Sequence, residues 1–202
     1  MKIALIGASG NAGSRILAEL LQRGHAVTAI VRNPDRVPAQ PGVTAVKGDV
    51  LDPKGLAPLL SGHDAVISSV HFSASDPVKL IEAVRAAGVK RYLVVGGAGS
   101  LEVAPGERLI DSPDFPPQYK EEASAGAAFL DRLRGETELD WTFLSPSAMF
   151  VPGERTGRFR LGGDALLVGA EGSSISFEDY AVALVDELEK PAHSRQRFTV
   201  GY

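Results

Sequence analysis

The 202-residue sequence contains no cysteine. Disulfide bonds and thiolate metal sites are therefore excluded, and a reducing compartment is compatible with the composition. No segment approaches the ~20 consecutive apolar residues that a membrane-spanning helix needs. The apolar run that follows Met1 and Lys2 is four residues long, too short for the core of a secretory signal. We therefore expect a cytoplasmic protein without a membrane partner.

The sequence also lacks an excess of positive charge. Lysine and arginine number 21 against 25 aspartates and glutamates, a net charge of −4, so the sequence predicts no nucleic-acid partner. The four histidines are scattered without the spacing of metal ligands, and we predict no metal site. Hydrophobic residues make up 44% of the chain, close to the average of globular proteins, and the length suits one domain with a sizeable core.

The most informative segment that is present is a glycine-rich turn, Gly7-Ala8-Ser9-Gly10-Asn11-Ala12-Gly13. It directly follows the apolar run 3–6 and precedes a helix-like segment, 14–21. A strand, a tight glycine turn and a helix start together point free backbone N–H groups and the positive end of a helix at a pyrophosphate. In this context the pattern predicts dinucleotide binding, although a structural turn is the alternative. The expected contacts are Gly7, Ser9, Gly10, Asn11, Ala12 and Gly13.

Strand-like and helix-like segments alternate along the whole chain, which predicts an α/β fold with a parallel, doubly wound sheet and helices on both faces. We expect the strand order 3-2-1-4-5-6 with a possible seventh strand. Asp52, Asp76 and Ser176 are expected to cap helices. The predicted strands are 2–6, 26–31, 43–46, 65–70, 91–95, 141–144 and 198–200, and the predicted helices are 12–23, 53–60, 77–87, 118–134 and 177–188.

Residues 1–202 are expected to form a single domain. The region around 150–172 is rich in glycine and arginine and lacks clean periodicity. It is too short for a second domain. We interpret it as a small lobe on the substrate side, over the carboxyl ends of the strands, where doubly wound folds bind ligands.

The residue at the end of the second strand indicates which dinucleotide is bound. A ribose-binding carboxylate should lie about 20 residues beyond the glycine turn. Arg32 stands at that place, 19 residues after Gly13, and no acidic residue ends the strand. A guanidinium pairs with a 2′-phosphate in bidentate fashion. We therefore expect NADP(H) to be preferred over NAD(H), with Asn33 adding a polar contact; the alternative is a solvated arginine.

Two further strand ends are expected to border the cofactor. Asp49 and Val50 follow the third strand, where Asp49 either accepts a hydrogen bond from the adenine amino group or serves as an ordinary turn residue. The small residues Ser68 and Ser69, with Val70, close the fourth strand, and their backbone is expected to pass the ribose closely.

With these positions the chain resembles the atypical short-chain dehydrogenase/reductase superfamily. Within it, the chain is similar to the NmrA-like NAD(P)H-binding group, which includes proteins called NADH-flavin reductases and biliverdin reductase B. The resemblance covers nearly the whole chain and is carried by GASGNAG, VRN, GDV, VVGGAGS, WTFLSPS with PGERTGRFR, and ISFEDYAVALVDELE. It implies a Rossmann-like fold, a redox role, and a nicotinamide near Gly97, Ala98, Pro146 and Ser147.

The chain departs from the superfamily at the catalytic residues. The superfamily uses a tyrosine proton donor and a lysine four residues later, a spacing that places both side chains on one helix face. Tyr119 is the candidate proton donor here, but the residue four positions on is Ala123. Lys120 lies about 100° around the helix and does not replace the missing lysine. This departure argues against carbonyl–alcohol chemistry.

Hydride transfer to a flavin, a quinone or a similar planar conjugated acceptor asks less of the protein, because the acceptor delocalises charge and water supplies the proton. We therefore predict an NAD(P)H-dependent reductase of this kind, with a small-molecule substrate site lined by His71, Phe72, Phe150 and Arg155. The alternatives are core packing for the two phenylalanines and solvation for His71 and Arg155. The alternative function is an NAD(P)-binding redox sensor of NmrA type without turnover. The oligomeric state is left open.

Overall fold

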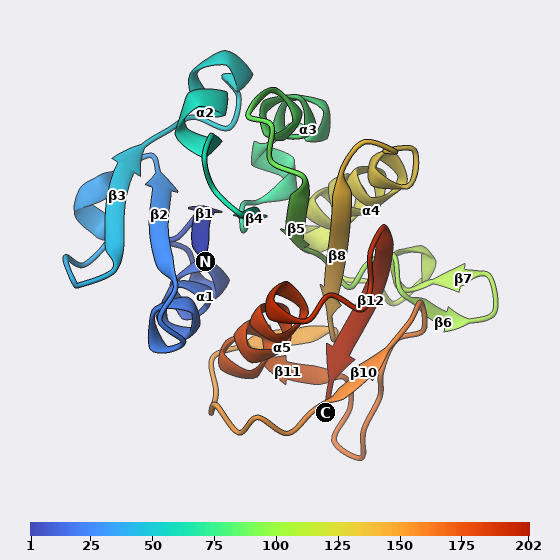
Figure 1. The fold of residues 1–202 in the computed structure, drawn as a ribbon. Helices are drawn as coiled ribbons and strands as arrows, with labels where there is room; N and C mark the ends of the chain where they lie inside the picture. Colours follow the sequence, from blue (N-terminus) through green and yellow to red (C-terminus); the bar gives the residue numbers. More distant parts are fainter.

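The computed structural model describes residues 1–202, which fold around one eight-stranded sheet (Figure 1). Across the sheet the strands are β10 (Arg160–Gly162), β12 (Gln196–Gly201), β8 (Asp140–Pro146), β5 (Arg91–Val95), β4 (Ala65–Ser68), β1 (Lys2–Ile6), β2 (Ala26–Val31) and β3 (Val43–Lys47). All neighbours from β3 to β12 are parallel, and only β10 pairs antiparallel. The predicted order is confirmed, and β12 is its seventh strand.

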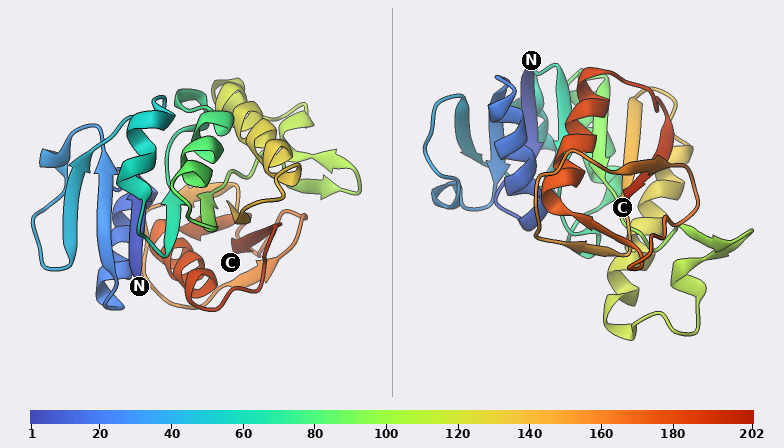
Figure 2. Two further views of the ribbon diagram at one scale, coloured as in Figure 1. Left: turned by 45° about the horizontal axis from the view of Figure 1, so that its top comes forward. Right: turned by 90° about the horizontal axis from the view of Figure 1, so that it is seen from below.

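Helices cover both faces of the sheet (Figure 2). On one face lie α1 (Asn11–Gln22) and α5 (Phe177–Glu189), which pack against each other, and on the other lie α2 (Pro53–Leu60), α3 (Pro77–Ala86) and α4 (Lys120–Arg134). Because strand side chains alternate between faces, Ile3 and Leu5 join the first core while Ala4 and Ile6 join the second. The sheet is thus buried on both sides, as its near-continuous apolar strands predict.

The predicted helix caps are confirmed by their hydrogen bonds. Asp52 Oδ1 accepts from the Gly55 amide at 3.1 Å, Asp76 Oδ1 from the Val78 amide at 2.8 Å, and Ser176 Oγ from the Asp179 amide at 2.9 Å. Each side chain satisfies an amide that the first helical turn leaves free. These contacts are local, which is why the sequence predicts them.

Several predicted element boundaries were wrong by one or two residues, among them the following two. The strand expected at 65–70 ends at Ser68, where Ser69 turns toward the glycine-rich segment. The helix expected from 118 begins at Lys120, because residues 117–119 form a 3₁₀ turn. The loop before it also contains a short hairpin that sequence reasoning missed, made of β6 (Glu102–Ala104) and β7 (Glu107–Arg108).

The region after β8 adds a small parallel pair, β9 (Met149–Val151) and β11 (Ser174–Ser176). Between these strands, the amides of Gly153 and Gly157 donate to Glu178 and Asp179 at the start of α5, at 2.8 and 2.7 Å. This stretch of the predicted lobe therefore lies against the start of α5. None of the helices has the length and apolar character needed to cross a bilayer.

Candidate cofactor site

Two glycines of the turn after β1 are required by the fold itself. Gly7 has φ +84°, and a Cβ added there would lie 2.0 Å from the Ser69 carbonyl oxygen. A Cβ on Gly13 would lie 2.1 Å from the Gly7 carbonyl oxygen. These backbones approach too closely for any side chain. Gly7 forms the tight turn and Gly13 lets α1 pack against it.

Gly10 is different, because the protein does not need the space beside it. Its φ of −79° suits any residue, and the nearest atom to an added Cβ is the Gly7 carbonyl oxygen at 3.4 Å. A glycine in an open, unstrained place is what close approach of a ligand to the backbone demands.

The start of α1 presents free donors at this glycine. The first backbone bond of the helix runs from the Ser14 amide to the Gly10 carbonyl at 2.9 Å, so the amides of Asn11, Ala12 and Gly13 have no backbone acceptor. No side chain caps the helix either. Free amides and the positive end of the helix dipole fit a pyrophosphate group.

The ribose end of the site contains an unpaired cation. Arg32 is exposed directly after β2, and it forms neither a hydrogen bond nor an ion pair within the protein. The neighbouring Asn33 uses its Oδ1 to accept from the Asp35 amide at 3.1 Å. Asp49 uses its Oδ1 to accept from the Leu51 amide at 2.9 Å, a turn contact that leaves its second oxygen free. Of these three predicted contacts, only the Arg32 side chain has no hydrogen bond or ion pair within the protein.

Two other predicted cofactor residues have hydroxyls that are already hydrogen-bonded within the protein. The hydroxyl of Ser68 is buried and bonds the Tyr92 hydroxyl at 2.9 Å, and burial raises the pKa of Tyr92. The hydroxyl of Ser147 is buried and donates to the Val200 carbonyl at 3.1 Å. The remaining predicted residues lie at strand ends or just beyond them, half-buried at Val50, Ser69, Val70, Gly97 and Ala98 and buried at Pro146.

The side chains of three of the four predicted substrate residues are already packed or paired within the protein. Phe72 is only 9% exposed and packs against Phe129 and Phe143, with ring centroids 5.5 and 6.0 Å away. The ring of Phe150 lies 4.5 Å from that of Phe177 and 4.7 Å from that of Tyr180. Both phenylalanines therefore pack as core residues.

Arg155 is an ion-pair partner of a helix, and its guanidinium is not available to a substrate anion without breaking that pair. Its Nε and Nη2 lie 2.7 and 2.8 Å from the carboxylate of Glu19 on α1. The bond from Arg155, with a further one from Arg23, holds the pKa of Glu19 below its ordinary value. His71 is the exception among the four candidates, because its side chain is 85% exposed.

Tyr119 lies on the 3₁₀ turn before α4 and is 61% exposed, and its hydroxyl has no hydrogen-bond partner. Four residues further, Ala123 packs against Gly99, where an added Cβ would lie 2.8 Å from the Ala123 Cβ. The start of α4 therefore lies next to the segment after β5, but the position four residues after Tyr119 carries a methyl group.

Sequence reasoning missed Glu122, which joins α4 to the loop after β4. Its two oxygens accept from the Phe72 amide at 2.7 Å, the Ser73 amide at 2.9 Å and the Ser73 hydroxyl at 2.6 Å. Burial raises the pKa of Glu122, but these three bonds outweigh it and hold the pKa below its ordinary value. An acidic residue in a first helical turn is common, so only the long-range contact reveals this role.

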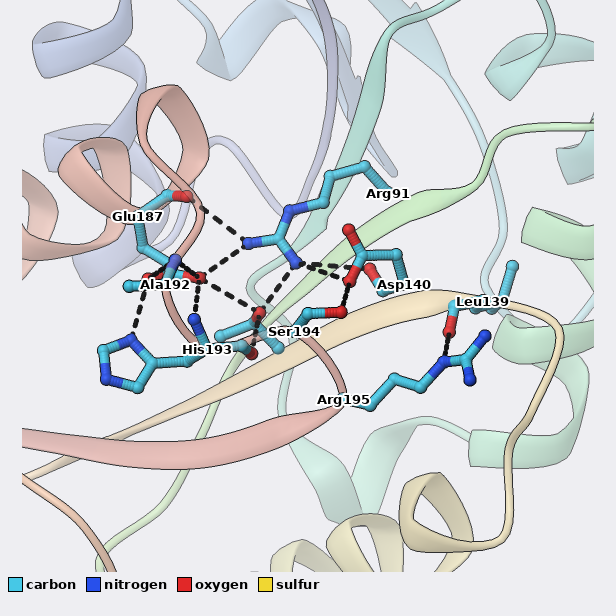
Figure 3. A network of polar contacts seen from close by, with 9 residues as sticks. Arg91, Leu139, Asp140, Glu187, Ala192, His193, Ser194 and Arg195 are labelled. Carbon is cyan, nitrogen blue, oxygen red and sulfur yellow. Dashed lines mark hydrogen bonds and ion pairs between the residues drawn. The ribbon is translucent and has the colours of Figure 1, made fainter.

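A dense polar network occupies the opposite edge of the sheet, where the strands begin (Figure 3). Arg91 at the start of β5 bonds Glu187 of α5 at 2.9 Å, and Asp140 at the start of β8 lies 3.4 Å from Arg91. Glu187 also accepts from the His193 amide at 3.0 Å and lies 2.8 Å from His193 Nδ1. These groups bind one another, so this edge holds the protein together instead of receiving a ligand.

The comparisons with known proteins agree with the free donors at the start of α1. The sequence profile of a family described as NAD(P)H-binding matches residues 7–191. YwnB of Bacillus subtilis, an uncharacterized protein, is 44% identical over 209 aligned residues, which cover 99% of this chain and 98% of YwnB.

Solved structures are similar over the full length. A candidate epimerase from Bacteroides thetaiotaomicron has a TM-score of 0.95 at 45% identity, covering 100% of this chain and 96% of its own. A candidate NADH-flavin reductase from Streptococcus pneumoniae has a TM-score of 0.84 at 41% identity, covering 100% and 99%. A short-chain dehydrogenase/reductase from Veillonella parvula in complex with NADP has a TM-score of 0.81 at 21% identity, covering 100% and 94%, a likeness of fold alone.

Proposed function

Because the chain belongs to the NAD(P)H-binding family, we propose that it is an oxidoreductase that transfers hydride from NADPH to a flavin, a quinone or a similar planar acceptor. The observation that carries this proposal is the open glycine turn. Gly10 leaves space beside three amides that have no acceptor in the protein. When bound there, the reduced nicotinamide supplies the hydride, while the protein binds the pyrophosphate, orients the rings and excludes water.

Arg32 supports the choice of NADPH over NADH. Its guanidinium is exposed and unpaired at the end of β2, where an acidic residue would otherwise bind the 2′-hydroxyl. An unpaired guanidinium binds a phosphate with two parallel hydrogen bonds.

The residue four positions after Tyr119 supports the planar acceptor. A ketone or alcohol substrate needs a proton relay, and Ala123 stands where the superfamily has its lysine. The same position argues against an epimerase activity of this chain. The Streptococcus relative is described as an NADH-flavin reductase, which agrees with the proposed acceptor class. We also propose the cytoplasm as the compartment, since a chain without cysteine suits a reducing environment.

Turnover of the purified protein tests this function. The protein is mixed with NADPH and with FMN, riboflavin or a simple quinone, and the loss of absorbance of the reduced nicotinamide is followed. The expected result is a rate above the enzyme-free reaction for at least one acceptor, with NADPH used better than NADH. If every acceptor is reduced only at the enzyme-free rate, the catalytic function is wrong.

A second candidate is a redox sensor of NmrA type that binds the dinucleotide and reports its oxidation state to another protein. The missing lysine near Tyr119 favours it as much as it favours a planar acceptor. Calorimetry and the turnover assay together separate the two functions. A sensor binds NADPH and NADP⁺ tightly and reduces no acceptor, whereas the reductase turns over.

A further inference from the structure

His71 has a defined place even though it is 85% exposed. The next residue, Phe72, is anchored by its ring in the core and by its amide on Glu122. The imidazole Nδ1 of His71 lies 3.5 Å from Glu122 Oε1, an ion-pair distance, and Nε2 has no partner in the protein. The carboxylate thus holds one side of the ring and leaves the other nitrogen free.

The residues before and after His71 each contact one part of the proposed cofactor site. Cγ1 of the preceding Val70 is 3.1 Å from the point where a Cβ on Gly7 would stand. On the other side, Cε2 of Phe72 is 3.6 Å from the corresponding point on Gly97. Gly7 belongs to the phosphate turn and Gly97 is expected to border the nicotinamide. The backbone at His71 therefore runs between the phosphate turn and the expected place of the nicotinamide.

Resting on the proposed function, we propose that His71, instead of bulk water, donates the proton to the reduced planar acceptor and that Glu122 positions it. With a quinone, the acceptor takes the hydride and becomes an anion. Its oxygen then takes the proton from Nε2 of the imidazolium, the N–H bond breaks and its electron pair stays on the ring. Solvent returns a proton to the exposed imidazole, so one quinone, one NADPH and one proton give one hydroquinone and one NADP⁺.

Glu122 is the charged side chain that faces His71. The 3₁₀ turn Phe72–Ala74, the strand β4 and the segment 96–100 carry no charged residue, so α4 alone brings one within ion-pair distance. An ionised carboxylate stabilises the imidazolium form by Coulomb attraction.

Steady-state kinetics with NADPH and a simple quinone test the role of His71. His71→Gln should lower kcat by about 10- to 100-fold with little change in the affinity for NADPH, because a general acid acts in the chemical step. The wild-type rate should fall as alkaline pH removes the proton, and this fall should be absent in His71→Gln. Tyr119→Phe, which removes the other candidate donor, should retain most of the rate.

The matched pair Glu122→Gln and Glu121→Gln tests positioning. Glu121 is exposed, adjacent and without a bond, so its variant is the control. Glu122→Gln should lower kcat with the quinone and leave the affinity for NADPH unchanged, and Glu121→Gln should change neither. NMR of the imidazole in cofactor-free protein gives a second readout without turnover, with the His71 ring signals moving in Glu122→Gln alone.

The outcomes separate this inference from the proposed function. If the wild type reduces no acceptor, the function is wrong and the inference is overturned with it. If the wild type turns over and His71→Gln keeps its rate and pH profile, only the inference is overturned. A large loss in Tyr119→Phe, or equal kcat values for the two glutamine variants, also overturns it.

Discussion

At the edge where the strands of the sheet begin, Arg91 and Glu187 are buried and bonded to each other, whereas at the edge where the strands end Arg32 and the first amides of α1 have no partner. Both edges carry strongly polar groups. At the first edge these polar groups are paired with one another, although Arg91 Nε and the neighbouring Trp141 indole N–H are buried without an acceptor.

The difference distinguishes the edge that holds the protein together from the edge where the proposed cofactor would bind. A paired, buried group lowers the free energy of the fold but offers nothing to a ligand, because binding would first have to break the pair. A free amide beside an open glycine contributes little to the fold and is ready for an anion. Substitutions at the two edges should therefore separate stability from binding.

The largest effect is expected at Gly10. Gly10→Val should abolish NADPH binding, because the valine fills the space that the pyrophosphate needs, while the backbone at φ −79° accepts valine without strain. Calorimetry should show no heat of binding, and the melting temperature should change by no more than a few degrees.

Two glycine variants are controls for Gly10→Val. Gly163 has open space around it, so Gly163→Val should bind NADPH as the wild type does. Gly7→Val should unfold the protein, because its Cβ would lie 2.0 Å from a backbone oxygen. Tight binding of NADPH by Gly10→Val would remove the glycine turn as the pyrophosphate site.

The next effect is expected at the opposite edge. Glu187→Ala should destabilise the protein by about 3–5 kcal/mol, because the buried Arg91 loses the nearer and more deeply buried of its two carboxylate partners. Urea denaturation measures this loss, and the affinity for NADPH under native conditions should not change. Glu82 is exposed and unpaired, so Glu82→Ala should stay within about 0.5 kcal/mol of the wild type.

The pH dependence of stability gives the sign of the Glu187 contribution. Burial raises the pKa of Glu187, but the bonds from His193 and Ala192 outweigh it and hold the pKa below the ordinary 4.5. Its stabilisation is therefore complete above pH 4.5 and is lost as the pH falls through the lower folded-state value. The stability difference between wild type and Glu187→Gln should shrink in acid. A constant difference would show that the carboxylate charge is not responsible.

The smallest effect is expected at Arg32. Arg32→Ala should weaken the binding of NADPH by about 1.5–3 kcal/mol, roughly 10- to 150-fold. The affinity for NADH should not change, because the guanidinium contacts only the 2′-phosphate, which NADH lacks. Arg36, exposed and unpaired four residues away, is the matched control, and Arg36→Ala should bind both dinucleotides as before. Equal losses for NADPH and NADH would contradict the role of Arg32 in choosing between them.

Much of the fold could be predicted, because its signals are local. The caps Asp52, Asp76 and Ser176 bond amides two or three residues away. The alternation of apolar strands with amphipathic helices was enough to predict the order of the sheet. The short strands β6, β9, β10 and β11 were missed, since three or fewer residues carry too little periodicity to detect.

The candidate site could be predicted only where backbone geometry defines it. The glycine turn follows from spacing. The residue types alone did not show that Phe150 packs against Phe177 or that Arg155 pairs with Glu19. Those partners lie on other elements of the chain. Glu122 was missed for the same reason, because its contacts are about 50 residues away in the sequence.

The sequence by itself thus determined the sheet, the helices and the phosphate turn, because steric limits on glycine, helix capping and apolar periodicity act between near neighbours. Only the tertiary structure decided which side chains are left for a ligand. A side chain is free or committed according to what folding brings within about 3–4 Å of it. Here folding gave Arg155 a carboxylate, buried Phe72 in the core and left Arg32 unpaired.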